Sequence, residues 1–307
     1  MAYYLGVDGG GSKTKSVLGD ESSILATAVT GPSNITRVGE VRARESLHEA
    51  IRAVCGAAKI DPHQLRGACV GAAGAGREEI ASVVRKIVAE VVPGEIVVVG
   101  DMQIALQAAL GEGPGVVVIA GTGSIAFGRD ASGKTARAGG WGFAVSDEGS
   151  AHWIGRAAVA AVLRSADESA EGQRIEQSST LFREMKSIWK VESFEQLART
   201  ANSTPDFAVL FPAVLAARRG GDELAQTILG RAATELARLA NVVVGHLFPE
   251  QHGAVPMAMA GGVFRHSATV RELFYNQIRT AHPHMVLNCE VVEPVHGALE
   301  MARRSTS

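Results

Sequence analysis

The hydrophobic pattern at the start of the chain alternates between strand-like runs and helix-like spacing. The runs YYLGV, TKSVLGD and ILATAVTG predict three strands, and apolar residues then recur at helical spacing over 41–58. A fourth strand, GACVG, runs into a glycine loop. It is followed by a helix over 78–91, a buried strand EIVVVGD and a helix over 102–110. Strands that alternate with helices in this way predict an α/β fold.

The same pattern returns after residue 113. The stretch GVVVIAGTGSIAFGRDASGKTARAGG predicts a strand, a Gly/Thr/Ser turn, a second strand, a polar turn and a third strand. The repeat lies in the pattern and not in the residues, and it predicts two related halves. Residues 150–247 are mostly helical, with breaks near Gly172, Pro205 and Gly220. VPMAMAGGVF then predicts a strand, a turn and a helix start, HMVLNCEVVEP a last strand, and HGALEMARRS a C-terminal helix.

Composition excludes several classes of protein. With 307 residues and 46% hydrophobic residues, the chain is large enough for two domains. A net charge of -2 gives no reason to expect nucleic acid or an acidic membrane as a partner. The three cysteines show no CxxC spacing, which argues against a disulfide framework or a zinc site and favours a cytoplasmic location. We expect neither a signal peptide nor a membrane span.

A glycine turn interrupts the hairpin predicted at the start of the chain. Asp8 precedes this turn, which consists of Gly9, Gly10, Gly11, Ser12, Lys13 and Thr14. Bare backbone N–H groups can point together at phosphate oxygens, and the hydroxyls and the lysine add donors and positive charge. Asp8 at the strand end suits Mg²⁺, directly or through water. The Walker spacing GxxxxGK[ST] is absent, and a plain hairpin turn is the alternative interpretation.

Two further turns of this kind follow. The second consists of Gly121, Thr122, Gly123 and Ser124, and it can hold the far phosphate from the opposite side. The third contains Gly261 and Gly262, between a strand and a helix, where a nucleotide can lie against bare backbone. Each turn alone is also compatible with an ordinary connection. Hydroxyl-flanked glycine turns at matching points of two half-repeats favour a nucleotide site.

These turns carry a resemblance to a known superfamily. GVDGGGSKT resembles the first phosphate motif of the sugar kinase, actin and heat-shock chaperone ATPases, AGTGS the second phosphate motif, and AGGVF the adenosine motif. Within that superfamily the chain is similar to the N-acetylglucosamine kinase family, which belongs to the BadF/BadG/BcrA/BcrD-type ATPase group. The stretches GPSNITRVG, VVVGDMQIAL and GGWGFAVSDEGSAHWIG add to this resemblance, which covers nearly the whole chain.

The resemblance implies a fold and an activity. It implies two ribonuclease H-like, actin-like ATPase domains with a cleft between them. The first would comprise residues 1–112 plus 296–307, and the second residues 113–295 with a helical insertion. It further implies an ATP- and Mg²⁺-dependent kinase that phosphorylates the 6-hydroxyl of an amino sugar, most simply N-acetylglucosamine. Related kinases are often homodimers, so a homodimer is expected.

The same resemblance makes Asp101 the general base that accepts the proton of the attacking hydroxyl. Its position agrees with that role, since Asp101 ends an apolar strand and starts a helix, at the edge where α/β sheets bind ligands. A helix N-cap is the alternative interpretation.

The sugar site implied by the resemblance comprises Asn34, Asp101, Trp141, Gly142 and Asp147. The Asn34 amide can recognise sugar hydroxyls, the Trp141 ring can pack on the sugar, and the Asp147 carboxylate can accept hydrogen bonds from hydroxyls. Each also has a structural alternative. Asn34 suits a turn, Trp141 suits a core, and Asp147 with Glu148 suits the start of a helix.

Three other functions remain open from the sequence. Glucosamine and N-acetylmuramic acid differ from N-acetylglucosamine only at the 2- and 3-positions, so a few pocket contacts decide among them. An ATP-driven activator of a dehydratase or reductase would share the nucleotide fold but needs closely placed cysteines for an iron–sulfur cluster. A sugar-sensing regulator would need a DNA-binding unit and a basic face, neither of which the sequence indicates.

Overall fold

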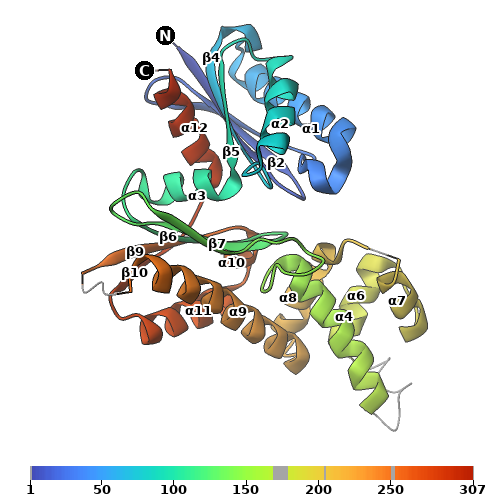
Figure 1. The fold of residues 1–307 in the computed structure, drawn as a ribbon. Helices are drawn as coiled ribbons and strands as arrows, with labels where there is room; N and C mark the ends of the chain where they lie inside the picture. The colour runs from blue at the N-terminus through green and yellow to red at the C-terminus, as the bar shows by residue number, and fades with distance from the viewer. Residues whose placement is uncertain (1, 169–178, 204, 250–252, 307) are drawn as a thin grey trace.

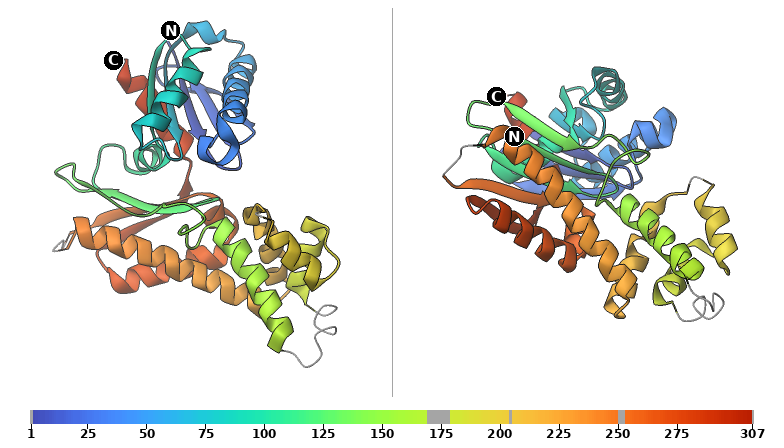
Figure 2. Two further views of the ribbon diagram at one scale, coloured as in Figure 1. Left: turned by 45° about the vertical axis from the view of Figure 1, so that its right-hand side comes forward. Right: turned by 60° about the horizontal axis from the view of Figure 1, so that its bottom comes forward.

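The computed structural model describes residues 2–168, 179–203, 205–249 and 253–306, which form two α/β halves stacked on each other (Figures 1 and 2). The first sheet has the strand order β3-β2-β1-β4-β5. Its strands are β1 (Tyr3–Gly9), β2 (Thr14–Gly19), β3 (Ile24–Thr30), β4 (Leu65–Ala72) and β5 (Glu95–Gly100). β1, β4 and β5 run parallel, whereas β2 and β3 complete an antiparallel meander.

The second sheet has the order β10-β9-β6-β7-β8. Its strands are β6 (Gly115–Ala120), β7 (Ser124–Arg129), β8 (Thr135–Gly139), β9 (Val255–Ala260) and β10 (Met285–Val292). The meander is again antiparallel, and β6, β9 and β10 are parallel. Both sheets therefore share one topology, which confirms the predicted repeat of two halves.

Helices cover both faces of the first sheet. α1 (Ile35–Ala58) and α2 (Glu78–Ala89) pack on one face, and α3 (Asp101–Leu110) and the C-terminal α12 (Pro294–Ser305) pack on the other. The connection from β10 to α12 thus returns the end of the chain to the first half, beside the N-terminus (Figure 1). A short 3-10 helix, η1 (Pro62–Gln64), precedes β4.

Helix α1 begins earlier than the hydrophobic spacing predicted. It starts at Ile35, with Asn34 as its N-cap, because the Asn34 side chain accepts a hydrogen bond from the Thr36 backbone N–H. Gly39 then leaves helical geometry at φ 77°, which kinks the helix. The hydrophobic spacing is therefore not continuous across Gly39, and the first turns of α1 were not predicted.

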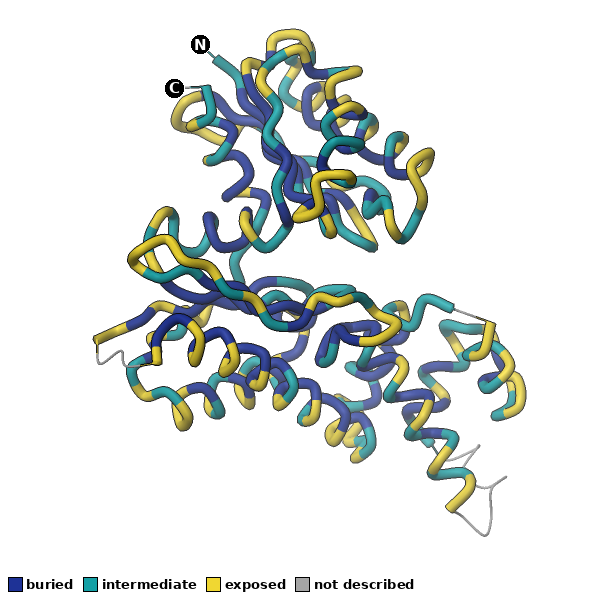
Figure 3. Tube along the Cα trace, viewed as in Figure 1, coloured by how far each residue is buried: buried dark blue, intermediate teal, exposed yellow. Residues whose placement is uncertain are grey.

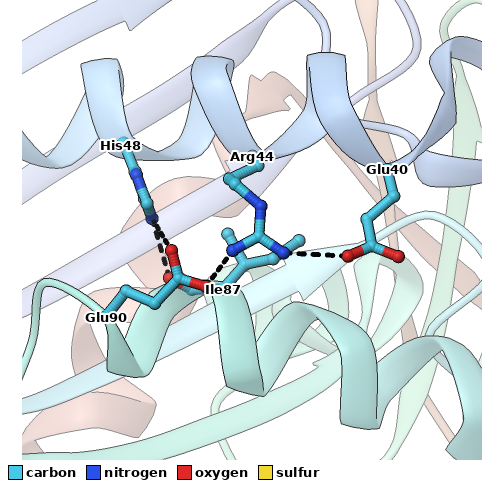
Figure 4. A network of polar contacts seen from close by, with 5 residues as sticks. All are labelled: Glu40, Arg44, His48, Ile87 and Glu90. Atoms are coloured by element: carbon cyan, nitrogen blue, oxygen red, sulfur yellow. Dashed lines mark hydrogen bonds and ion pairs between the residues drawn. The ribbon is translucent and has the colours of Figure 1, made fainter.

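Polar contacts join α1 to α2 (Figure 4). The Arg44 guanidinium pairs with Glu40 on its own helix at 2.8 Å and with Glu90 at the end of α2. The His48 ring nitrogen Nε2 lies 2.8 Å from the Ile87 carbonyl oxygen and 3.4 Å from the Glu90 carboxylate. These contacts hold the two helices side by side over the core of the first half.

Helix α3 lies between the two sheets (Figures 1 and 3). Ile104 packs with Tyr4, Val17 and Leu299 against the first sheet and α12. On the other side of the helix, the neighbouring Ala105 and Leu106 pack with residues of the second sheet in a separate cluster. Because both faces of α3 are buried, its N-terminal residue Asp101 has a fixed place at the junction of the halves.

The second half carries the largest core and a helical insertion. α9 (Glu223–Leu247) and α11 (Ala268–Ala281) lie under its sheet, and the short α10 (Gly262–His266) follows β9. The insertion consists of α4 (Ala151–Glu168), α6 (Thr180–Trp189), α7 (Phe194–Ala201), η2 (Phe207–Leu210) and α8 (Phe211–Arg219). Helix breaks occur near Pro205 and Gly220, as predicted, whereas the break predicted near Gly172 lies outside the described residues. Among the described helices, none is both long and apolar enough to span a bilayer.

Replacing Gly297 by alanine should destabilise the fold, because it inserts a methyl group where α12 meets α3. A Cβ at Gly297 would lie 2.6 Å from the Ala108 backbone nitrogen, so the two helices would have to move apart. We expect a loss of about 3 kcal/mol in the free energy of unfolding, measured by urea denaturation.

Gly56→Ala is the matched control, because a Cβ added at this position of α1 would meet nothing within 4 Å apart from its chain neighbours and the backbone of its own helix. It should raise stability by about 0.5–1 kcal/mol through helix propensity. Equal midpoints for the two variants would contradict close packing of α12 on α3.

Candidate active site

The first glycine turn joins β1 to β2 and holds the start of α1. The Gly10 backbone N–H donates to the Lys13 carbonyl at 3.1 Å, and the Gly10 carbonyl accepts from the Ser33 and Asn34 backbone N–H groups. Thr14 is fully buried, and its Oγ1 lies 2.7 Å from both the Gly31 carbonyl oxygen and Ser33 Oγ. The Thr14 hydroxyl therefore supports the turn from inside, while Ser12 and Lys13 are exposed.

The second turn contacts the first across the junction of the halves. Ser12 Oγ and Thr122 Oγ1, which are 110 residues apart in the chain, lie 2.8 Å from each other in a hydrogen bond. The backbone of α4 supports the second turn, since the Ala151 N–H donates to the Gly121 carbonyl at 2.9 Å. Ser124 directs its hydroxyl to the Glu148 carbonyl at 2.8 Å, so this hydroxyl is used within the protein.

The third turn lies against the second. Gly261 has φ 97°, a conformation that side chains rarely adopt, and a Cβ there would sit 2.9 Å from the Gly121 backbone nitrogen. Gly262 then begins α10. The structure thus brings all three predicted glycine turns together, the first and second through hydroxyls and the second and third through bare backbone.

Two carboxylates lie beside these turns. Asp8 is the last residue but one of β1, and burial raises the pKa of its carboxyl to about 7, with the charge of Asp101 as the next cause. Lys15 and Lys13 act in the opposite direction on the Asp8 pKa, and Glu293 acts in the same direction as Asp101. An acid of this kind, facing a second carboxylate at a strand end, is a suitable ligand for a divalent cation.

Asp101 is the first residue of α3, and the N-cap interpretation is wrong. Gly100 occupies the N-cap, and its N–H donates to the Gln103 side-chain oxygen at 2.9 Å. Asp101 accepts from the Met102 backbone N–H at 3.0 Å, which orients the carboxylate. Burial raises the pKa of Asp101, although the residue as a whole keeps some solvent access.

Asp147 links the second turn to the glycine-rich loop that contains Gly142. It has a left-handed φ of 65°, is buried, and sits so close to Gly123 that a Cβ there would lie 2.8 Å from Asp147 Oδ2. Burial raises the pKa of Asp147, while hydrogen bonds from the Ser124 and Gly142 backbone N–H groups lower it. The charge of Asp101 also reaches Asp147, so the three aspartates Asp8, Asp101 and Asp147 form one electrostatic group.

Asn34 and Trp141 occupy different surroundings. Asn34 Oδ1 accepts from the Thr36 N–H and hydroxyl, so its amide NH₂ is the part suited to a ligand. Trp141 is 70% exposed, which makes the core alternative wrong. Its ring lies 4.2 Å from the Arg137 guanidinium and lines an open groove of about 390 Å³ with α9 residues such as Arg238. No described contact joins the Trp141 ring to Asp101.

Two sets of charged residues at the junction were not found from the sequence. Glu293, the N-cap of α12, pairs with Lys15 of β2 and with Arg265 of α10, each at 2.5 Å. Arg37 of α1 pairs with Asp206 of the insertion at 2.6 Å. Each pair joins residues far apart in the sequence, so neither motif spacing nor periodicity could have identified it.

Two halves of identical topology, with three glycine turns gathered at their junction, define the actin-like ATPase fold class. The chain belongs to the BadF/BadG/BcrA/BcrD ATPase family, whose model matches residues 5–302. It is 32% identical to an N-acetylmuramic acid/N-acetylglucosamine kinase of Clostridium acetobutylicum, over 99% of each chain. It is 29% identical to an N-acetyl-D-glucosamine kinase of Dictyostelium discoideum, over 98% of each chain.

Solved structures share the fold. A crystal structure from Chromobacterium violaceum, described as a candidate N-acetylglucosamine kinase, superposes with a TM-score of 0.77 at 24% identity and covers 98% of this chain and 99% of its own. A ROK family glucokinase from Streptomyces griseus superposes with a TM-score of 0.64 at 17% identity, covering 99% of this chain and all of its own. Sugar kinases of different families thus use this arrangement of two halves.

The raised pKa of Asp8 predicts a pH-dependent stability. From about pH 4 to 7 the folded protein keeps a proton on Asp8 that the unfolded chain has lost, so stability falls as pH rises through this window. Asp8→Asn removes this loss. In metal-free buffer we expect the variant to be more stable than the wild type by about 4 kcal/mol near pH 8 and equal to it near pH 4.

Thermal unfolding at both pH values measures this difference. If Asp8 holds a divalent cation, added Mg²⁺ should raise the melting temperature of the wild type near pH 8 and leave the asparagine variant unchanged. An equal Mg²⁺ response in both proteins would argue against Asp8 as a ligand.

Proposed function

We propose that this protein transfers the γ-phosphoryl group of ATP to the 6-hydroxyl of an amino sugar, with N-acetylglucosamine as the first candidate. The observation that carries the proposal is the place of Asp101. Its carboxylate acts electrostatically on Asp8, which precedes the first turn, and on Asp147, which lies against the second turn. A phosphoryl group held between these turns would face Asp101 across the acceptor hydroxyl.

Asp101 suits the role of general base. Its backbone contact with Met102 fixes the carboxylate, and its raised pKa makes it a better proton acceptor than an exposed aspartate. Phosphoryl transfer is mostly a matter of positioning and charge, so a rigid helix start that orients the hydroxyl and takes its proton is sufficient for this step.

The glycine turns supply the nucleotide side. The N–H groups of the first and second turns are suited to the phosphates, with Ser12, Lys13 and Thr122 as further donors. Asp8 is the residue that would hold Mg²⁺. This cation, when bound, neutralises charge on the phosphates. Bare backbone at Gly261 and Gly262 is suited to the adenosine.

The sugar side is built from Asn34, Gly142 and Asp147. The Asn34 NH₂ can donate to a hydroxyl, and Asp147 can accept from one where its lone pairs are not taken by the Ser124 and Gly142 N–H groups. The relative from Clostridium acetobutylicum is named for both N-acetylmuramic acid and N-acetylglucosamine. This name supports N-acetylmuramic acid as an alternative substrate, and glucosamine is kept as a second alternative. Trp141 would contact the sugar only if its loop moved.

The activator function is a weaker candidate. An activator of a 2-hydroxyisocaproyl-CoA dehydratase shares the fold, with a TM-score of 0.51 at 11% identity. An iron–sulfur cluster needs closely placed thiolates. Here Cys55 and Cys69 are buried in different clusters, and burial raises their pKa to about 11 and 12, while Cys289 lies exposed on β10. This placement does not support a shared cluster.

Three expectations from the sequence remain predictions. They are the homodimer, the cytoplasmic location and the domain limits at residues 112 and 296. The last limit falls within α12, and α3 contacts both sheets, so the halves share a wider boundary than a single linker.

Asp101→Asn should lower turnover far more than nucleotide binding. The amide keeps the size and the backbone contact but accepts no proton, so we expect kcat to fall by about 10²–10⁴-fold. Affinity for an ATP analogue should change by less than about threefold, since the nucleotide contacts remain. Glu79→Gln, which removes an exposed carboxylate on α2, is the control and should leave both quantities unchanged. Unchanged turnover in the Asp101 variant would remove the base assignment.

A coupled ADP-release assay across an amino-sugar panel tests the substrate. The panel contains N-acetylglucosamine, glucosamine, N-acetylmuramic acid and glucose, and phosphorus NMR places the phosphate on the product. We expect the highest kcat/KM for an N-acetylated sugar, with the phosphate on the 6-oxygen. ADP release that no sugar stimulates would contradict the kinase proposal and favour the activator.

A further inference from the structure

Arg37 has a place that no motif explains. It lies in the first turn of α1, three residues after the N-cap Asn34, and its side chain crosses to the other half of the molecule. Its Nη2 lies 2.6 Å from Asp206 Oδ1. The same Asp206 oxygen accepts from the Ala208 backbone N–H at 3.0 Å, where it caps η2. A single carboxylate thus starts a helix of the insertion and anchors the guanidinium.

The other end of the guanidinium faces the phosphate turns. A Cβ at Gly11 would lie 3.3 Å from Arg37 Nη1 and 3.6 Å from Thr122 Cβ. Since Ser12 and Thr122 are hydrogen-bonded at the same point, Nη1 lies beside the junction of the first and second turns. A guanidinium carries five N–H donors, so the bond to Asp206 leaves others for a ligand.

The charge of Arg37 acts beyond its partner Asp206. The pKa of the buried His152 is lowered first by burial and next by Arg37, and the opposite effect of Asp206 is smaller. The Arg37 guanidinium therefore brings positive charge to the meeting point of the turns, where a triphosphate would place its last group.

We propose that Arg37 binds the γ-phosphate of ATP and that Asp206 positions it, which adds a residue to the proposed kinase site and rests on that function. In phosphoryl transfer, negative charge spreads over the equatorial oxygens of the transferred group. A guanidinium held in place by a carboxylate stabilises this charge without reorganisation. Because ADP has no γ-phosphate, Arg37 distinguishes the substrate nucleotide from the product nucleotide.

The test compares two nucleotides in the Arg37→Ala variant. Calorimetry with Mg²⁺ and no sugar measures the Kd of a non-hydrolysable ATP analogue and of ADP. We expect the Kd of the analogue to rise by about tenfold or more and that of ADP by less than about twofold, and kcat to fall by about 10²–10³-fold. Arg37→Lys should recover little, because an ammonium lacks the planar fork. Equal changes for the two nucleotides, or none, would overturn the proposal.

Two further variants separate this role from a structural one. Arg42→Ala removes the same charge from an exposed site on the same helix and should leave both Kd values unchanged. Asp206→Asn keeps an oxygen for the η2 cap but weakens the anchor, so it should show the same nucleotide preference at intermediate size with an unchanged melting temperature. If Asp206→Asn and Arg37→Ala lower the melting temperature alike and change the Kd of both nucleotides equally, the ion pair only stabilises the contact between the two halves. The nucleotide comparison stands without any sugar, so a failure to phosphorylate amino sugars would count against the proposed function alone.

Discussion

Burial of helix α3 on both of its faces is the constraint on which the rest of the structure depends. Ile104 packs toward the first sheet and α12, while Ala105 and Leu106 pack toward the second sheet. A helix held in this way cannot rotate without opening one of two cores. Its first residue, Asp101, is therefore fixed at the junction, and a carboxylate that belongs to one half faces the turns of both.

The glycine turns meet at the same junction for a steric reason. Gly261 lies so close to the second turn that a side chain would displace backbone, and a side chain at Gly123 would collide with the Asp147 carboxylate. This contact leaves backbone N–H groups and a few hydroxyls at the junction. Three aspartates lie beside them, with Lys13, Lys15 and Arg37 as nearby cations. The junction therefore offers backbone donors and cations to a polyanion, and carboxylates to the cation that accompanies it.

Sequence reasoning was most successful where a local rule acts. The strand–turn–strand units, the third turn and the C-terminal helix follow from period and glycine placement, and the structure has them. It left alternatives open where two local rules compete. Asp101 looked like a cap, but Gly100 caps α3 because the Gln103 side chain satisfies its N–H. Trp141 could have been a core residue, but a loop with left-handed glycines carries it to the surface beside Arg137.

The sequence by itself determined the elements, the repeat of two halves and the residue types able to hold a nucleotide, because hydrophobic period and glycine placement are local properties of the chain. Only the tertiary structure decided which of those residues meet. Ser12 with Thr122, Lys15 with Glu293 and Arg37 with Asp206 each join distant segments. Such contacts depend on how the sheets stack around α3, and that stacking is set by burial summed over the whole chain, which no short motif records.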